Sequence, residues 1–214
     1  MAIAAVALGG LWLAPSRTAQ TSGLLPVSGA EAQTTEALPV IEDIVLGNPD
    51  AAVTFTEYAS YTCPHCATFH ATVFKDLKRD YIDTGKIKFV YREVFFDRFG
   101  LWAAMVARCG GSTERYVGIA EILYSTQRDW AGVNDPAVVA GNLRRIGRTA
   151  GLSDAELDVC LSDSAKAQAM IAKFEADTKA DDIKATPTIM INGEQFSNRS
   201  YADFRAILDA KLGQ

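Results

Sequence analysis

Two stretches of the chain, residues 53–58 (VTFTEY) and residues 87–91 (IKFVY), are rich in alternating β-branched and aromatic residues. This pattern is typical of β-strands. Between them, hydrophobic residues recur at helical spacing and Gly85 ends the run; the recurring residues are Cys66, Phe69, Val73, Leu77 and Tyr81. The order strand, helix, strand predicts a parallel pair joined by a right-handed crossover, with the helix beginning at the carboxyl end of the first strand.

The middle of the chain, from about residue 100 to residue 183, has a helical pattern of hydrophobic positions. Two helix starts carry clear signals. Asp135 before Pro136 supplies an N-cap followed by a proline in the first turn, and Ser153 with Glu156 forms a capping box. The pattern predicts five helices, over residues 101–109, 114–128, 136–148, 153–161 and 165–178.

Short strands are expected again after these helices. Residues 188–191 (TIMI) form one, and Asn192-Gly193 is a strong hairpin turn that leads to a second at Gln195-Phe196. A final helix is expected over residues 201–212. Strands at both ends with helices between them predict the α/β class, with one mixed sheet covered by helices and an inserted helical lobe.

Composition and charge narrow the class of protein. The 214 residues, 49% of them hydrophobic, are enough to bury a substantial core, so most of the chain is expected to be ordered. The formal net charge is −5, and no block of Lys and Arg occurs. Both features argue against a nucleic-acid partner.

The N-terminal residues 1–38 differ from the rest. Residues 2–14 are almost wholly small and apolar, and they precede a stretch of Ser, Thr, Gly, Pro and Gln. The apolar run is too short to span a bilayer comfortably but fits a signal peptide, and Ala30-Glu31-Ala32 resembles a cleavage site. We therefore expect a signal or anchor segment with a linker, and an exported, periplasmic protein that is either released or tethered.

The sequence Cys63-Pro64-His65-Cys66 places two cysteines where the first predicted strand gives way to the helix. Pro64 suits the first helical position because its missing N–H donor costs nothing there. Cys63 then lies at the N-cap, where unpaired N–H groups and the helix dipole favour a thiolate, and His65 adds a donor or a positive charge. Because a stabilised thiolate favours the reduced pair, its disulfide is expected to be an oxidant.

Two other interpretations of the cysteine pair remain open. The pair could be half of a zinc site, but zinc needs four ligands and the other cysteines, Cys109 and Cys160, are isolated in helical segments. Haem attachment would require a histidine at position 67, which is Ala67. We expect no metal and no organic cofactor.

At this point the chain resembles the DsbA family of thioredoxin-fold proteins, whose active site is Cys-Pro-His-Cys. The resemblance covers residues from about 40 to 214. It predicts a thioredoxin-like domain formed by residues 39–97 and 184–214, with an inserted helical domain over residues 98–183. Arg92-Glu93 and the isolated Cys109 and Cys160 resemble the alphaproteobacterial branch, whose members carry a second disulfide.

The resemblance also implies functions for residues outside the motif. Glu57 lies on the same strand face as the apolar Phe55, and the matching acid of the family takes part in proton transfer beneath the disulfide. The alternative is a partly exposed glutamate near the strand end. Thr186-Pro187 resembles the cis-proline loop of the family, which would leave the Thr186 backbone free to pair with an extended substrate.

The two remaining cysteines and the second histidine receive structural interpretations. Cys109 and Cys160 are expected to form a structural disulfide, which the chain-entropy model values at about 4 kcal/mol. Two buried free thiols are the alternative. His70, one helical turn past Cys66, is expected to be a packing or surface residue.

These features predict a thiol-disulfide oxidoreductase that donates the Cys63–Cys66 disulfide to unfolded or reduced exported proteins. The resemblance implies reoxidation by a membrane partner of the DsbB type, and we expect a monomer. A disulfide isomerase or reductase of the same fold is the alternative, followed by a zinc or peptide-binding module.

Overall fold

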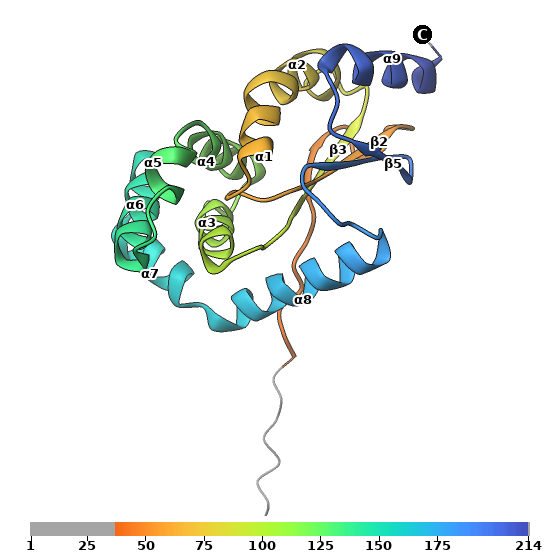
Figure 1. Cartoon of the computed structure of the whole chain (residues 1–214). Coiled ribbons are helices and arrows are strands. Elements are labelled where there is room, and N and C mark those ends of the chain that lie inside the picture. The colour runs from red at the N-terminus through yellow and green to blue at the C-terminus, as the bar shows by residue number, and fades with distance from the viewer. Residues whose placement is uncertain (1–36, 214) are drawn as a thin grey trace, which may run out of the picture. The chain divides into compact units, whose positions relative to one another are not determined.

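A mixed five-stranded sheet forms within residues 37–213, the part of the chain that this computed structural model describes (Figure 1). The strand order is β1-β3-β2-β4-β5, and β2 and β3 run parallel while the other neighbouring pairs are antiparallel. The predicted parallel pair and α/β class are therefore confirmed. The strands are β1 (Ile44–Gly47), β2 (Thr54–Ala59), β3 (Lys88–Glu93), β4 (Thr188–Ile191) and β5 (Glu194–Ser197).

Strand β1 is absent from the sequence-based prediction. Its four residues, Ile-Val-Leu-Gly, are too few to show an alternating pattern, and the strand is defined by its antiparallel pairing with β3. Ile44 and Leu46 pack partly buried against the core. The strand ends at Gly47, which has a φ of 78°, and a Cβ there would lie 2.4 Å from the Ile87 carbonyl oxygen. Only glycine fits this approach.

The hairpin between β4 and β5 has the geometry expected from its sequence. Asn192 and Gly193 both have positive φ angles, 50° and 82°, as a two-residue type I′ turn requires. The Asn192 side chain accepts a hydrogen bond from the Thr54 N–H at 2.7 Å. This contact joins the turn to the beginning of β2.

The helix that begins after Cys63 and contains Cys66 runs without interruption but includes two segments of π-helix. Its segments are α1 (Pro64–Phe69), η1 (His70–Phe74), α2 (Lys75–Leu77) and η2 (Lys78–Ile82). All five hydrophobic positions predicted to face inward are buried: Cys66, Phe69, Val73, Leu77 and Tyr81. The expected helix and its buried face are confirmed.

Helices fill the chain between β3 and β4, as predicted. They are α3 (Arg98–Arg108), α4 (Thr113–Ser125), α5 (Gln127–Ala131), α6 (Pro136–Thr149), α7 (Asp154–Ser162) and α8 (Ser164–Ala180). The expected single helix over residues 114–128 is wrong, because the chain turns at Thr126 and begins α5. That turn buries Trp130, whose indole N–H donates to the Leu123 carbonyl at 2.8 Å. The predicted N-caps at Asp135 and Ser153 are both present.

Helices cover both faces of the sheet (Figure 1). On one face, Phe55 of β2 packs against Phe89 and against Phe204 of the C-terminal helix α9 (Tyr201–Leu212), with ring centroids 5.7 and 5.4 Å apart. On the other face, the Tyr58 hydroxyl donates to the Asp181 carboxylate at the end of α8. Alternate residues of β2 therefore meet different helices, as the pleat requires.

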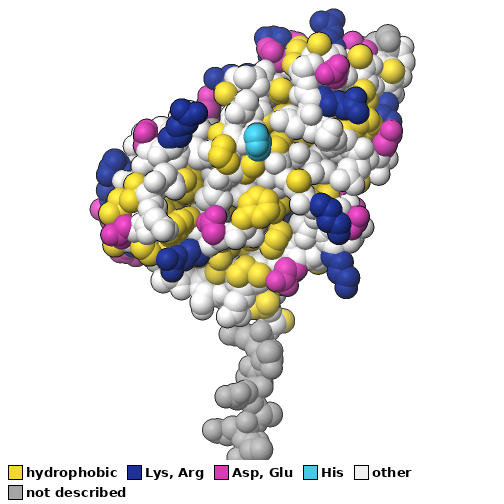
Figure 2. All heavy atoms as spheres, viewed as in Figure 1, with side chains coloured by type: hydrophobic (Ala, Val, Ile, Leu, Met, Phe, Trp, Pro, Cys, Tyr) yellow, Lys and Arg dark blue, Asp and Glu magenta, His cyan; other side chains and the backbone are white. Residues whose placement is uncertain are grey.

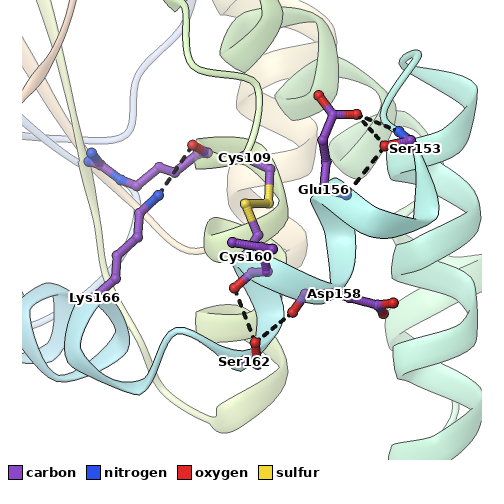
Figure 3. The surroundings of a disulfide bond; sticks show 9 residues. Cys109, Ser153, Glu156, Asp158, Cys160, Ser162 and Lys166 are labelled. Atoms are coloured by element: carbon purple, nitrogen blue, oxygen red, sulfur yellow. Dashed lines mark hydrogen bonds between the residues drawn. A yellow bond between two sulfur atoms is a disulfide. The ribbon is translucent and has the colours of Figure 1, made fainter.

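A disulfide joins Cys109, the C-cap of α3, to Cys160 in α7, as expected (Figure 3). Their Cα atoms are 5.8 Å apart and the bond closes a separation of 51 positions. Nearby, Lys166 at the start of α8 donates to the Arg108 carbonyl at 3.3 Å. The disulfide and this bond hold α7 and the start of α8 against the end of α3.

The expected export segment, with its Ala30-Glu31-Ala32 motif, lies outside the described residues. Within residues 37–213, no helix is both long and apolar enough to cross a membrane. The boundaries proposed for the two domains stay predictions.

Candidate active site

The two cysteines of the motif lie where β2 leads into α1. Cys63 is the N-cap of α1, with φ −83° and ψ 118°, and Pro64 occupies the first turn. The Cys63 carbonyl accepts hydrogen bonds from the N–H groups of Cys66 and Ala67 at 3.1 and 3.2 Å. Cys63 exposes 8% of its surface and Cys66 none, and both are free thiols. An incoming thiol therefore meets Cys63.

The environment shifts the pKa values of the two thiols in opposite directions. Hydrogen bonding to the Cys66 thiol lowers the pKa of Cys63 to about 5, against the effect of burial, with further contributions from Thr186 and from the N–H groups of Cys66 and His65. Burial raises the pKa of Cys66 far above its usual range, and the negative charges of Cys63 and Glu57 add to this. Cys63 is thus a thiolate at neutral pH while Cys66 keeps its proton. The side chain of His65 is exposed to solvent.

The Thr186-Pro187 loop lies opposite Cys63, and its peptide bond is cis, as expected. The Sγ of Cys63 lies 3.4 Å from the Thr186 carbonyl oxygen. The Thr186 hydroxyl is the one buried side-chain polar atom in residues 37–213 that has no hydrogen-bond partner. The structure therefore brings the predicted substrate-binding loop and the accessible cysteine into contact.

Glu57 lies fully buried on β2, and its carboxylate contacts His70 of η1. The His70 Nε2 atom is 3.2 and 3.1 Å from the two carboxylate oxygens. Its ring stacks on Tyr124 with centroids 4.1 Å apart and lies 4.5 Å from the Phe74 ring. His70 is thus a packing residue, as expected, but it also pairs with the buried acid.

The sequence analysis did not connect His70 with Glu57. A signal was present, because a carboxylate on an apolar strand face needs a polar partner and His70 lies on the helix that follows that strand. Gln127 of α5 was also missed, and no sequence signal marks it. Its buried amide donates to the carbonyl oxygens of Tyr61 and Cys63 at 2.8 and 3.0 Å, which holds the loop before α1.

A small cleft of about 100 Å³ adjoins the Thr186 loop. Phe96, which is 60% exposed, contributes to its wall. Figure 2 shows hydrophobic side chains gathered across the middle of the face in view, with many of the charged groups toward its margin. The cleft is lined by Val94, Phe96, Phe174, Thr178, Ile183, Lys184, Ala185 and Thr186. It has room for a single apolar side chain beside the Thr186 loop.

No group of three or more His, Cys, Asp or Glu side chains with the arrangement of a metal site occurs in the described part of the chain. The fold and the site together define a dithiol protein of thioredoxin-like architecture. Its reactive thiolate begins a helix and faces a cis-proline loop, and its partner thiol is buried.

Comparison with known proteins gives the same class. The thioredoxin family model matches residues 40–210. A Rickettsia bellii protein named "Putative protein-disulfide oxidoreductase" is 37% identical over 170 residues, which are 79% of this chain and 64% of that protein. Disulfide bond formation protein D of Bacillus subtilis is 28% identical over 169 residues, 76% of this chain and 72% of that protein. The chain thus spans less than two thirds of the Rickettsia relative.

The solved structure of alpha-DsbA1 from Wolbachia pipientis superimposes with a TM-score of 0.74 at 27% identity, covering 82% of this chain and 94% of that one. The chain belongs to the thioredoxin family and is DsbA-like within it. The expected resemblance and fold are confirmed.

Proposed function

We propose that this protein is a thiol-disulfide oxidoreductase that donates the Cys63–Cys66 disulfide to exported proteins. The observation that carries the proposal is the opposite shift of the two cysteine pKa values. The pKa of Cys63 is lowered to about 5 while that of Cys66 is raised. Stabilising Cys63 as a thiolate favours the reduced pair, and a favoured reduced pair makes the disulfide an oxidant.

The exchange proceeds in two balanced steps. A substrate thiolate attacks the Sγ of Cys63, the Cys63–Cys66 bond breaks, and Cys66 leaves and takes up a proton. A second substrate thiolate then attacks the substrate sulfur of the mixed disulfide, and Cys63 leaves as the stabilised thiolate. The substrate is oxidised and the enzyme pair is reduced. Glu57, fully buried on β2, supplies this proton from its protonated carboxyl group and is left as a carboxylate.

Recognition of the substrate relies on the loop opposite Cys63. An extended chain can pair with the Thr186 backbone irrespective of its sequence, while one apolar side chain enters the cleft beside Phe96. We propose a periplasmic location, monomeric action on unfolded or reduced exported proteins, and reoxidation by a DsbB-like membrane partner. The similarity to DsbA-like proteins supports these assignments.

The redox potential of the Cys63–Cys66 couple tests the direction of transfer. We expect it well above the value of about −270 mV that is typical of thioredoxin. Oxidative refolding of a reduced substrate should be fast, and reduction of insulin slow. A potential close to that of thioredoxin would contradict the oxidase and favour a reductase. Rapid reshuffling of a scrambled substrate by the reduced protein would favour an isomerase.

A further inference from the structure

The buried half of the active site has no direct contact with water. Cys66 and Glu57 each expose 0% of their surface. Under the proposed function, Cys66 must gain a proton when substrate attacks Cys63 and must lose one when the pair is reoxidised. The proposed function assigns that proton to Glu57, whose buried carboxyl group then needs a route to solvent.

His70 lies between Glu57 and a cavity of about 240 Å³. The cavity is bounded by strands β1 and β3, by the continuous helix from α1 to η2 and by helix α4. A water molecule occupies about 30 Å³ in the liquid, so several fit. Four of its lining residues are solvent-exposed and place its mouth at the surface: Ala71, Lys75, Glu121 and Ser125.

The other titratable groups near His70 are poorly suited to carry a proton. Tyr91 of β3 and Tyr124 of α4 line the cavity and bond to each other through their hydroxyls, and burial raises the pKa of both well above the usual range. Burial does the same to Tyr116 of α4. These phenols therefore stay protonated at neutral pH.

The remaining charged groups lie along the cavity on the elements that bound it. Lys78 is paired with Asp83 at 2.6 Å, while Lys75 and Glu121 are exposed. Among the cavity-lining groups in residues 37–213, His70 is the one that hydrogen-bonds the Glu57 carboxylate. An imidazole has two ring nitrogens, so one can pass a proton to the carboxylate while the other takes one from water.

We propose that His70 is the proton carrier that connects the buried Glu57 to water through this cavity. The inference rests on the proposed function and assigns a positioning residue that acts through Glu57. When the Cys63–Cys66 bond breaks, Cys66 takes its proton from Glu57, Glu57 is reprotonated from the His70 Nε2, and His70 takes a proton from cavity water. Reoxidation moves one proton along the same path in the opposite direction.

Two substitutions separate proton transfer from packing. His70→Ala removes the ring and opens its space to the cavity. His70→Gln retains an amide that can donate to Glu57 but cannot relay a proton. Phe74→Ala is the matched control, because Phe74 lines the same cavity and contacts the His70 ring but has no exchangeable proton.

The measurement is the rate at which the oxidised protein forms a mixed disulfide with a cysteine peptide, followed across pH with and without added imidazole. Positioned acid–base groups contribute factors of about 10² to 10⁴, so we expect both His70 variants to lose about tenfold or more. The pH dependence of this rate should differ from that of the wild-type protein in both His70 variants. Imidazole should restore His70→Ala saturably, but neither His70→Gln nor Phe74→Ala.

If both variants keep the wild-type pH profile and imidazole has no effect, the inference is overturned. An active wild-type protein would still leave the proposed function standing. A wild-type protein without exchange activity would overturn both. If circular dichroism shows that His70→Ala is unfolded, the pH profile of His70→Gln decides: a profile that differs from that of the wild type supports the relay, and an unchanged profile contradicts it.

Discussion

At the scale of single residues, the active pair depends on one proton shared between two sulfur atoms. Hydrogen bonding to the Cys66 thiol is the largest cause of the lowered pKa of Cys63. The same contact helps to raise the pKa of Cys66. The two thiols therefore reinforce each other, and the helix N–H groups contribute less than the sequence pattern alone implies.

Replacing Cys66 tests this account. Cys66→Ala removes the thiol donor, so we expect the pKa of Cys63 to rise clearly from about 5. The ultraviolet absorbance of the thiolate across pH measures it. The matched variant His65→Ser removes an exposed side chain but keeps the backbone N–H of residue 65 that lowers the pKa of Cys63. A smaller rise of this pKa is therefore expected. A larger effect of His65→Ser would show that the imidazole sets the reactivity.

The lowered pKa of Cys63 also makes the stability of the reduced protein depend on pH. Folding lowers this pKa from an ordinary value of 9.0 to about 5, so the native state favours the thiolate. The stabilisation is complete above about pH 9, declines as the pH falls, and is lost below about pH 5. The raised pKa of Cys66 affects the stability of the reduced protein only above about pH 9.

Relative to the oxidised protein, the reduced form should therefore gain stability as the pH rises from about 5 to about 9. Urea unfolding of both forms at a series of pH values measures the difference. A difference that stays constant across the window would contradict the assigned Cys63 thiolate.

At the scale of elements, two glycines of α6 provide a matched pair. A Cβ on Gly147 would lie 2.6 Å from a methyl carbon of the buried Leu157 in α7, whereas a Cβ on Gly141 meets nothing within 4 Å. We expect Gly147→Ala to cost about 1–3 kcal/mol through overpacking. Gly141→Ala should stabilise by up to about 1 kcal/mol through helix propensity. Denaturant unfolding gives both values, and equal effects would refute the close packing of α6 on α7.

The Cys109–Cys160 disulfide is the covalent tie between elements. Removing a bond that closes 51 positions should lower the free energy of unfolding by about 2–4 kcal/mol. Cys109→Ala, Cys160→Ala and the double variant should lose nearly equal amounts, because each removes the same bond. Unfolding in denaturant measures them, and a double variant that lost the sum of the singles would exclude the disulfide as the shared cause.

At the scale of the whole molecule, a buried polar network connects the sheet, the inserted helices and the loop before α1. Arg108 of α3 holds Glu93 of β3 through two hydrogen bonds of 2.6 and 2.7 Å. The Tyr116 hydroxyl of α4 donates to the same carboxylate at 3.1 Å and accepts from Tyr61 at 2.8 Å. The packing of the inserted helices thus extends to two residues before Cys63.

Replacing one member of the buried Glu93–Arg108 ion pair should lower the free energy of unfolding. Glu93→Gln leaves the Arg108 guanidinium buried without its counter-charge, which typically costs about 3–5 kcal/mol. The double variant Glu93→Leu with Arg108→Met removes both charges and should recover part of that loss. Thermal and denaturant unfolding check the prediction. As a control, Arg148→Ala at the exposed pair with Asp154 should show no comparable loss.

Local patterns in the sequence determined the elements and their chemistry. The alternation in β2 and β3, the caps at Asp135 and Ser153, and the Asn192-Gly193 turn act within a few residues, so the sequence shows them directly. The same holds for the Cys63–Cys66 pair, because the strand end and Pro64 together define its place at a helix start. Each of these features depends on neighbours along the chain.

Tertiary structure decided the features that join distant residues. Strand β1 exists through its pairing with β3, and the turn at Thr126 buries Trp130. His70 acquires its polar partner only because η1 packs over the face of β2 that carries Glu57, and Thr186 meets Cys63 across 123 positions. Burial, pairing and hydrogen bonding between such residues depend on the whole packed chain, so no local pattern specifies them.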